Sequence, residues 1–377
     1  MSARDLGPTP LADGFSVAPW RGMIAPLLAA GWADLARDAA TANPFLDHWF
    51  LAPSLAQFDP QERVLLATLV QDGRLVALMP LWRNGDYSGH YLPHLANWIH
   101  ANCFCGEPLV AQGHSEAYWS QLLEWCDRHH RASLFLHLAC LPTDGAAFGT
   151  LRDLCAQSGR SFAPVKIFER AALRRGISPE EHLAATLEKK RRKELSRKRR
   201  RLEEIGQLEF SRRTDAEGLE DWIDGFLALE RSGWKGERGS SLASAPQTEA
   251  LFRQSLHGAA AEGRLERLAL HLDGKPIAML CNFIAPPFSF AFKTAFDEAH
   301  RKLSPGMLLQ VENLALLRRP DIELSDSCAV PGHPMIEQIW SDRREMAMVS
   351  VGIGGRLRRA IGAMLTTIEL RREEARQ

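Results

Sequence analysis

FSFAFKTAFDEAHRKLSPGMLL, residues Phe288 to Leu309, combines an alternating apolar strand, a polar elbow and a Ser-Pro-Gly turn that opens a helix. The phenylalanines fall on one face of the predicted strand, and the residues between them, Lys293 included, fall on the other. Pro305 suits the first position of a helix, and Gly306 permits close approach of the backbone to a ligand. A helix N-terminus presents free N–H groups and a positive dipole end, so the stretch predicts a phosphate site. The alternative is a strand-turn-helix without a ligand.

Composition and charge are those of an ordinary soluble globular protein. A chain of 377 residues exceeds what one hydrophobic core usually supports, so we expect two domains. Hydrophobic residues make up 45% and charged residues 24%, which are ordinary values for such a protein. Basic and acidic residues number 46 each, so no global field draws the protein to nucleic acid or to a membrane.

The sequence also predicts a cytoplasmic protein without a metal. Seven cysteines, an odd number scattered through the chain, indicate reduced thiols and not a disulfide framework. The N-terminus, MSARDLGPTPLADGF, lacks the basic start and apolar core of a secretion signal, and no apolar run is long enough to span a bilayer. His100, Cys103 and Cys105 form an H-x-x-C-x-C motif with no second ligand pair at zinc spacing.

A weak internal repeat supports two related halves. Ala67–Met79 reads ATLVQDGRLVALM, and Leu268–Leu280 reads LALHLDGKPIAML. In each, an Asp-Gly pair between alternating strands predicts a two-residue hairpin. Around the hairpins, helices are expected at 21–58, 116–129, 143–157, 216–232 and 247–262, and strands at 132–138, 265–272, 276–284 and 288–296. The order of elements recurs, which predicts α/β or α+β layers in both halves.

The densest charge lies between Lys189 and Arg201, where ten of thirteen residues are Lys or Arg. Nucleic-acid binding would use such a run on phosphates, but no aromatic residue interleaves it for base stacking. Leu187, Leu195 and Leu202 recur at helical spacing, so we favour a solvated amphipathic helix. Contact with anionic lipid, a phosphorylated substrate or a cofactor phosphate stays open.

Three ordered motifs carry a family resemblance: LERSGWKGERGSSL at 229–242, GRLERLALHLDGKPIAML at 263–280 and FKTAFDEAHRKLSPGMLL at 292–309. Together they resemble the CelD/BcsL family, acetyltransferases of the GNAT superfamily associated with cellulose and exopolysaccharide synthesis. The resemblance implies tandem GNAT-like domains, each a mixed twisted sheet flanked by helices. We expect a degenerate GNAT-like domain at 1–172, a basic helical linker at 173–206 and the acyltransferase domain, with a C-terminal amphipathic helix, at 207–377.

The resemblance also implies a donor site. GNAT enzymes hold the acyl-CoA pyrophosphate with a Q/R-x-x-G-x-G/A loop, and this sequence offers Arg301, Ser304 and Gly306 at matching positions, so Ser replaces the first glycine. Backbone N–H groups from Ser304 to Leu308, that of Met307 included, would form the phosphate nest. Strand 288–296 would splay from its neighbour to receive the pantetheine arm, and one N–H there would stabilise an oxyanion. Phe296 stands where relatives often show Tyr, the usual acid.

Six side chains are candidates for the chemistry and the acceptor site. Asp297 and His300 follow the strand, and a His there has the pKa range of a general base, although a structural His is the alternative. Glu230 could deprotonate the acceptor through a water molecule, or it could simply cap a helix face. Lys293 within an apolar strand needs a charged partner or a cleft. Trp234 and Lys235, on the SGWKG loop, are candidates for binding substrate, or else an aromatic anchor and an exposed lysine.

The function that these expectations imply is transfer of an acetyl or longer acyl group from acyl-CoA to an amine or hydroxyl of a cell-envelope glycan or lipid precursor. One alternative is N-acylation of a sphingoid-type lipid amine, with the basic run and the amphipathic stretch 355–376 at the inner face of the membrane. Packing of that stretch on the protein itself is the other interpretation. Aminoacyl transfer from tRNA and a non-catalytic CoA- or glycan-binding module also stay open.

Overall fold

A computed structural model describes residues 11–87, 89–129, 132–355, 357–360, 362 and 364. The chain forms two compact units, each an α/β arrangement of a mixed sheet with helices on both faces. Unit 1 comprises Met1–Phe168 with Glu345–Gln377, and unit 2 comprises Glu169–Arg344. The sequence-based division had grouped the last segment with the second domain. In the structure it belongs with the first, because β13 (Asp342–Gly352) pairs antiparallel with β6 (Phe135–Pro142).

The sheet of unit 1 follows the order β1-β2-β3-β4-β6-β13, and β5 pairs with β3. The first four strands are antiparallel neighbours, whereas β4 and β6 run parallel. Helices α1–α3 pack on one face and α4 and α5 on the other. Its remaining elements are β1 (Gly14–Pro19), η1 (Trp20–Gly22), α1 (Ile24–Ala29), α2 (Trp32–Asp38), η2 (Pro44–Leu46), α3 (His48–Phe58), β2 (Leu65–Gln71), β3 (Arg74–Tyr87), β4 (His90–Asn97), β5 (Leu109–Val110), α4 (Ser115–His129) and α5 (Ala146–Gln157).

Unit 2 repeats this topology. Its strands follow the order β8-β9-β10-β11-β12, again three antiparallel pairings and then a parallel one, and β12 also pairs with the end of β7 (Phe162–Arg174). The elements are α6 (Pro179–Thr186), α7 (Lys189–Ile205), β8 (Leu208–Arg213), α8 (Leu219–Ser232), α9 (Trp234–Glu237), η3 (Leu242–Ser244), α10 (Pro246–Ala261), β9 (Leu265–Leu272), β10 (Lys275–Ala285), β11 (Phe288–Phe296), η4 (Glu298–Leu303), α11 (Pro305–Asn313), η5 (Leu314–Arg318) and β12 (Leu324–Asp326).

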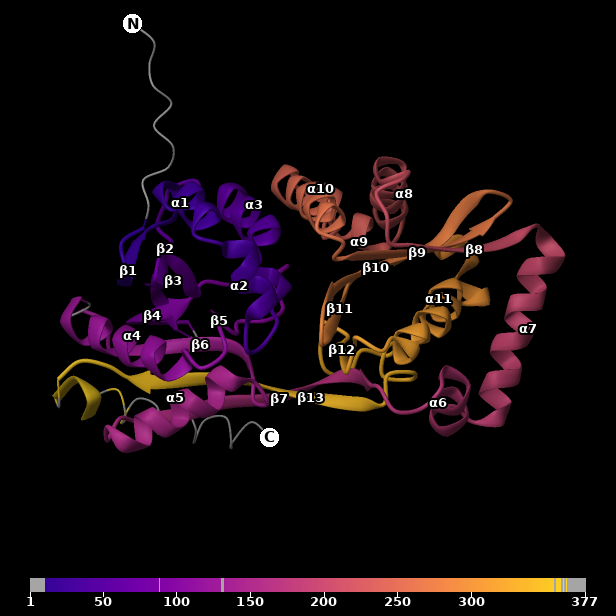
Figure 1. The fold of residues 1–377 in the computed structure, drawn as a ribbon. Coiled ribbons are helices and arrows are strands. Elements are labelled where there is room, and N and C mark those ends of the chain that lie inside the picture. Colours follow the sequence, from indigo (N-terminus) through magenta and orange to yellow (C-terminus); the bar gives the residue numbers. More distant parts are fainter. Residues whose placement is uncertain are drawn as a thin grey trace, which may run out of the picture. The chain divides into compact units, whose positions relative to one another are not determined.

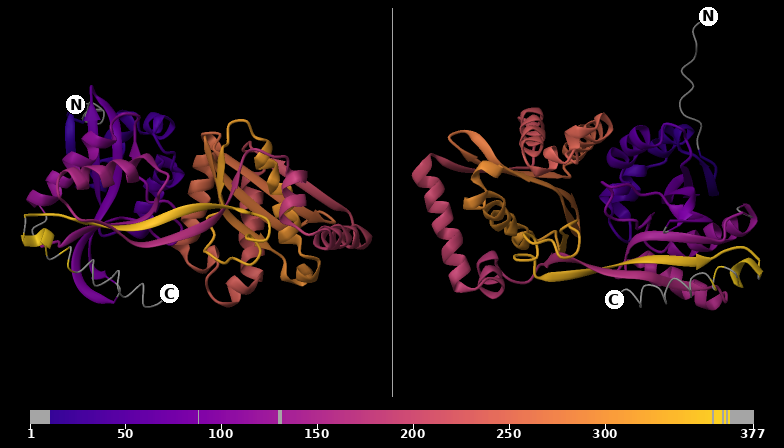
Figure 2. Two further views of the ribbon diagram at one scale, coloured as in Figure 1. Left: turned by 90° about the horizontal axis from the view of Figure 1, so that it is seen from below. Right: turned by 180° about the vertical axis from the view of Figure 1, so that it is seen from behind.

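Within unit 2, α8 and α10 cover one face of the sheet, and α11 and α7 lie over the other (Figures 1 and 2). The predicted amphipathic helix in the basic run is confirmed as α7, since Leu187, Leu195 and Leu202 join the core beneath it. This helix is part of the compact unit. The basic side chains therefore project from a fixed surface, and not from a free linker.

Both Asp-Gly hairpins are confirmed. Asp72-Gly73 joins β2 to β3 and Asp273-Gly274 joins β9 to β10, with positive φ at all four residues, as the turn that fits twisted strands requires. The expected helices correspond to α1–α5, α8 and α10, and the expected strands to β6, β9, β10 and β11. The strand expected at 132–138 is shifted to β6 at 135–142. Most of the amphipathic stretch 355–376 lies outside the described residues, which include only 355, 357–360, 362 and 364 of it.

Candidate functional site

An extra residue in β11 changes which face of the sheet its side chains occupy. Cys281 of β10 pairs with Lys293, whereas Phe283 pairs with Phe290, so two steps along β10 correspond to three along β11. Phe292 is thus part of a β-bulge, and Lys293 shares a face with Phe290. The Lys293 Nζ lies 5.2 Å from the centre of the Phe292 ring. The expectation that Lys293 points away from the phenylalanines is therefore wrong, because strict alternation ends at the bulge.

The parallel neighbour of β11 accompanies only its beginning. The ladder joins Phe288 to Leu324 and ends with Phe290 and Asp326, whereas β10 pairs with β11 along its whole length. The second half of β11, which carries the bulge, thus lies beyond the end of the β12 ladder. A strand edge at such a position can offer backbone hydrogen bonds to an extended ligand.

Buried charges hold the end of β12 where the two strands separate. The Asp326 carboxylate, fully buried, accepts hydrogen bonds from the Arg170 Nη1 at 3.4 Å, the Arg344 Nη1 at 3.3 Å and the Cys328 N–H at 2.8 Å. The Arg344 guanidinium also lies 4.9 Å from the Phe288 ring centre. These contacts fix the position of β12 relative to β11 and were not foreseen from the sequence, because the three charged residues are far apart in the chain.

The predicted phosphate turn forms the N-terminus of α11. Pro305 occupies the first turn as expected, and Ser304 precedes it in the left-handed region, with φ of 54°. No side chain caps this end of α11 within the part of the chain that the structure describes. The Ser304 Oγ instead accepts a hydrogen bond from the Lys198 Nζ of α7 at 2.9 Å. A basic side chain from the charged run therefore stands at the positive end of the α11 dipole.

Packing inside the protein explains why position 306 in this turn is a glycine. A Cβ at Gly306 would lie 3.0 Å from Phe296 Cδ1 and 3.3 Å from Met335 Sδ. The close approach at Gly306 is thus made by the Phe296 ring, which seats α11 on β11. Met307 is buried in the same core, whereas Arg301 is exposed at the end of η4. Their roles in holding a cofactor stay a prediction.

The structure brings Asp297 and His300 together. The His300 Nδ1 lies 2.7 Å from Asp297 Oδ2, and the other carboxylate oxygen accepts from the Ala299 N–H at the start of η4. Both side chains are partly exposed, at 28% and 30%. Since the carboxylate accepts the Nδ1 proton, it leaves Nε2 as the basic nitrogen, which is the arrangement of an oriented general base.

Glu230 and Lys293 occupy one neighbourhood on the α8 face. Burial raises the pKa of the Cys281 thiol to about 12, and among the weaker effects Lys293 lowers this pKa while Glu230 raises it. The Glu230 Oε2 accepts a hydrogen bond from the Leu242 N–H at 2.7 Å, so this carboxylate anchors η3. Trp234 and Lys235 belong to α9. Their side chains lie outside the part of the structure that is described.

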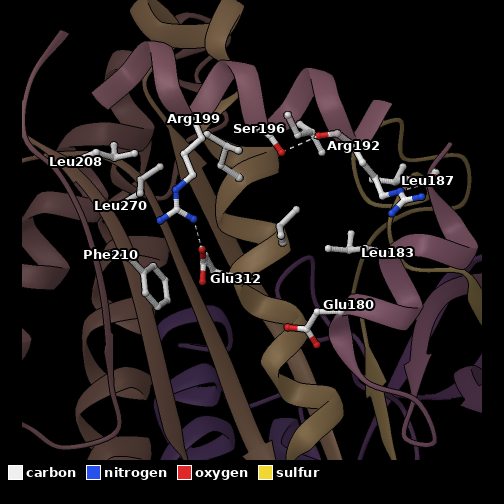
Figure 3. A pocket seen from close by; sticks show the side chains of 13 residues that line it. Glu180, Leu183, Leu187, Arg192, Ser196, Arg199, Leu208, Phe210, Leu270 and Glu312 are labelled. Atoms are coloured by element: carbon white, nitrogen blue, oxygen red, sulfur yellow. Dashed lines mark hydrogen bonds and ion pairs between the residues drawn. The ribbon is translucent and has the colours of Figure 1, made fainter. Parts of the chain in front are cut away.

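A groove of about 330 Å³ lies between α7 and α11 (Figure 3). Its walls are mostly apolar, and Arg199, which pairs with Glu312 at 3.1 Å, crosses its edge. The other lining residues come from α6, α7, β8, β9 and α11: Glu180, Leu183, Leu187, Arg192, Leu195, Ser196, Leu208, Phe210, Leu270, Leu308 and Val311.

Unit 1 has the same short parallel ladder, but its own chain fills the space beyond it. Only Leu95 and Ala96 of β4 pair with β6. The next residue, Asn97, donates through Nδ2 to Ala139 O at 3.0 Å and accepts from the Ala139 N–H at 2.8 Å. The Gly106 N–H donates to Cys140 O at 2.8 Å. An extended ligand could not occupy this edge of β6 without displacing Asn97 and Gly106.

Residues 189–324 match the model of an acetyltransferase (GNAT) domain. The match begins with α7 and ends at the first residue of β12, so it contains Lys198, the bulged strand, the His300–Asp297 pair and the N-terminus of α11. No curated protein matches this sequence.

Three solved structures show the same fold over most of the chain. A protein of unknown function from Bacteroides thetaiotaomicron has a TM-score of 0.55 and 14% identity, covering 86% of this chain and 96% of its own. FemX has a TM-score of 0.53 and 11% identity, covering 87% and 97%. The C-terminal domain of a putative lysylphosphatidylglycerol synthetase from Agrobacterium fabrum has a TM-score of 0.53 and 12% identity, covering 91% and 95%. The family match within unit 2 and the topology repeated in unit 1 confirm the expected fold of tandem GNAT-like units.

Two features of the described residues bear on metal binding and on membrane contact. No group of three or more His, Cys, Asp or Glu side chains there could hold a metal ion. His100 is packed among aromatic rings, stacked on Phe50 at 6.0 Å. No helix in the described ranges has the length and apolar character needed to cross a membrane.

Proposed function

We propose that unit 2 is an acyl-CoA-dependent acyltransferase, of the CelD/BcsL kind, that acylates an amine or hydroxyl of a cell-envelope glycan or lipid precursor. One observation carries the proposal: the Lys198 ammonium lies 2.9 Å from the Ser304 Oγ at the uncapped N-terminus of α11 and 2.9 Å from Glu194 Oε1, which holds it in place. Free N–H groups, a helix dipole and a fixed cation together favour a pyrophosphate. The bulged half of β11 leads to this turn, which suits a donor lying along the strand.

The chemistry would be direct transfer. The acceptor nitrogen or oxygen attacks the thioester carbonyl and forms a bond to its carbon, the C–S bond breaks, and the departing thiolate takes up a proton. His300, with its Nδ1 held by Asp297, would remove the acceptor proton through Nε2. A backbone N–H of β11 would stabilise the oxyanion. Arg301 and the Met307 N–H would complete the phosphate contacts, and Trp234 and Lys235 would bind the acceptor.

Donor binding can be tested by calorimetry with acetyl-CoA and the variant Lys198→Met. We expect the Kd to rise about tenfold, since a hydrogen bond to a charged group is lost. Lys193→Met is the matched control. Lys193 is exposed on the same helix and lies more than one turn before Lys198, the residue that contacts Ser304. Equal effects of the two substitutions, or no binding of CoA by the unaltered protein, would refute the donor site.

The catalytic assignment has a separate test. In His300→Gln, release of CoA thiol in the presence of an acceptor amine should fall by about 10² to 10⁴, while acetyl-CoA affinity stays unchanged. Asp297→Asn should lower the rate less and shift its pH profile. An unchanged rate in His300→Gln would show that another group removes the proton.

A lipid substrate is a second candidate, favoured by the apolar groove between α7 and α11. Ser196 lines this groove, so Ser196→Trp should fill it. We expect this substitution to weaken binding of a long-chain acyl-CoA while leaving acetyl-CoA binding unaltered. Equal affinity for the long-chain donor in both proteins would exclude the groove as the acyl-chain site.

A further inference from the structure

Unit 1 contains a second pocket, of about 350 Å³, on the face of its sheet opposite α4 and α5. Leu95 and Leu136 pack toward α4 and α5, so their chain neighbours His94 and His137 face the other way. Both histidines line the pocket. Its volume is at the lower end of the roughly 300–1,000 Å³ of small-molecule sites.

A hydrogen bond at Nδ1 fixes the orientation of each imidazole ring. The His94 Nδ1 lies 2.8 Å from Leu92 O, and because a carbonyl can only accept, Nδ1 carries the proton and Nε2 is left as an acceptor. The His137 Nδ1 lies 3.2 Å from the Ser350 Oγ, which in turn lies 3.3 Å from the Tyr87 hydroxyl. Ser350 is buried, so these rings are held by the sheet and not by solvent.

The pocket has little net charge. Burial lowers the pKa of His137 to about 4 and also lowers the pKa of His94, so both rings are neutral near pH 7. Asp86 and Lys166 are the charged side chains among the lining residues, and their charges are opposite. A strongly anionic or cationic ligand would therefore gain little here. An uncharged ligand with several hydroxyl groups would find both donors and acceptors.

The remaining lining adds aromatic and amide side chains to these polar groups. Trp82 and Tyr87 contribute aromatic rings, and Asn84 contributes an amide. A sugar ring has an apolar face that suits an aromatic ring and hydroxyl groups that suit amide, carboxylate and imidazole partners. We propose that this His94–His137 pocket of unit 1 binds an uncharged sugar ring. This site is distinct from the donor site proposed in unit 2, and sugar binding does not require that acyl transfer occur.

The test is NMR of the full chain with ¹³C-labelled histidine, titrated with N-acetylglucosamine in the absence of acyl-CoA. Spectra of His94→Gln and His137→Gln assign the two ring signals. We expect both signals to move with a common Kd near the millimolar range, whereas the signal of His114, which is partly exposed and does not line this pocket, stays in place. His137→Gln should weaken binding about tenfold, and His114→Gln should leave it unaltered.

Two results would overturn the proposal. One is the absence of any movement of the His94 and His137 signals with N-acetylglucosamine and with glucose. The other is equal movement with inorganic phosphate, which would indicate a charge-selected site. If His137→Gln fails to fold, Asn84→Ala tests the same pocket, because Asn84 is only half-buried, and the same loss of affinity is expected.

Discussion

Replacement of Asp326 by Asn should destabilise unit 2 severely, because it removes a buried carboxylate that accepts hydrogen bonds from two buried guanidinium groups. Asp326 and Arg344 are fully buried and Arg170 is 4% exposed. Breaking a buried pair by removing one partner costs about 3–5 kcal/mol, since the remaining charge stays desolvated. Asn has nearly the same shape as Asp, so the loss of stability would come from the missing negative charge and not from a cavity.

Urea unfolding followed by tryptophan fluorescence measures the effect. With an m-value of about 2 kcal/mol/M, a loss of 3 kcal/mol lowers the midpoint by about 1.5 M. Asp321→Asn is the matched control: Asp321 pairs with Arg319 at 2.7 Å, but the two side chains are 40% and 29% exposed. An exposed pair contributes at most about 1 kcal/mol. Equal midpoints for the two variants would refute the claim that Asp326 anchors β12.

Three further outcomes follow from packing and protonation. Gly306→Ala should lower the free energy of unfolding by about 1–3 kcal/mol, because its Cβ would contact the Phe296 ring. Adding Phe296→Leu to the same chain should restore part of this stability. Denaturation curves that show no recovery would contradict this packing. Because the unfolded chain protonates His137 near pH 6.5 but the folded chain only near pH 4, stability should fall by up to about 3 kcal/mol as pH decreases through this window. His137→Gln should flatten that pH dependence, and an unchanged curve would argue against a buried neutral ring. Buried Cys281, with its pKa near 12, should resist alkylation at pH 8 until the protein unfolds, and rapid labelling of the native protein would contradict its burial.

The alternating phenylalanines, the two Asp-Gly hairpins and the Ser-Pro-Gly turn are local signals, and they were sufficient to predict β11, both hairpins and the start of α11. Backbone preferences and side-chain periodicity act over a few residues, so the sequence alone displays them. The leucine spacing in the basic run likewise predicted α7. The three-residue strand β12 has no such periodic signal, and neither β12 nor the eleven-residue β13 was predicted, because their partners lie far along the chain.

The site itself depended on tertiary structure. Lys198 stands on Ser304 only because α7 packs beside α11, and Lys293 faces the phenylalanines only because Phe292 forms a bulge. Asn97 blocks the edge of β6 in unit 1 by bonding to Ala139, which lies 42 residues further along the chain. The sequence determined which elements form. Long-range packing determined which charges meet, because the position of a side chain relative to distant segments is set by the assembled core and not by its neighbours in the chain.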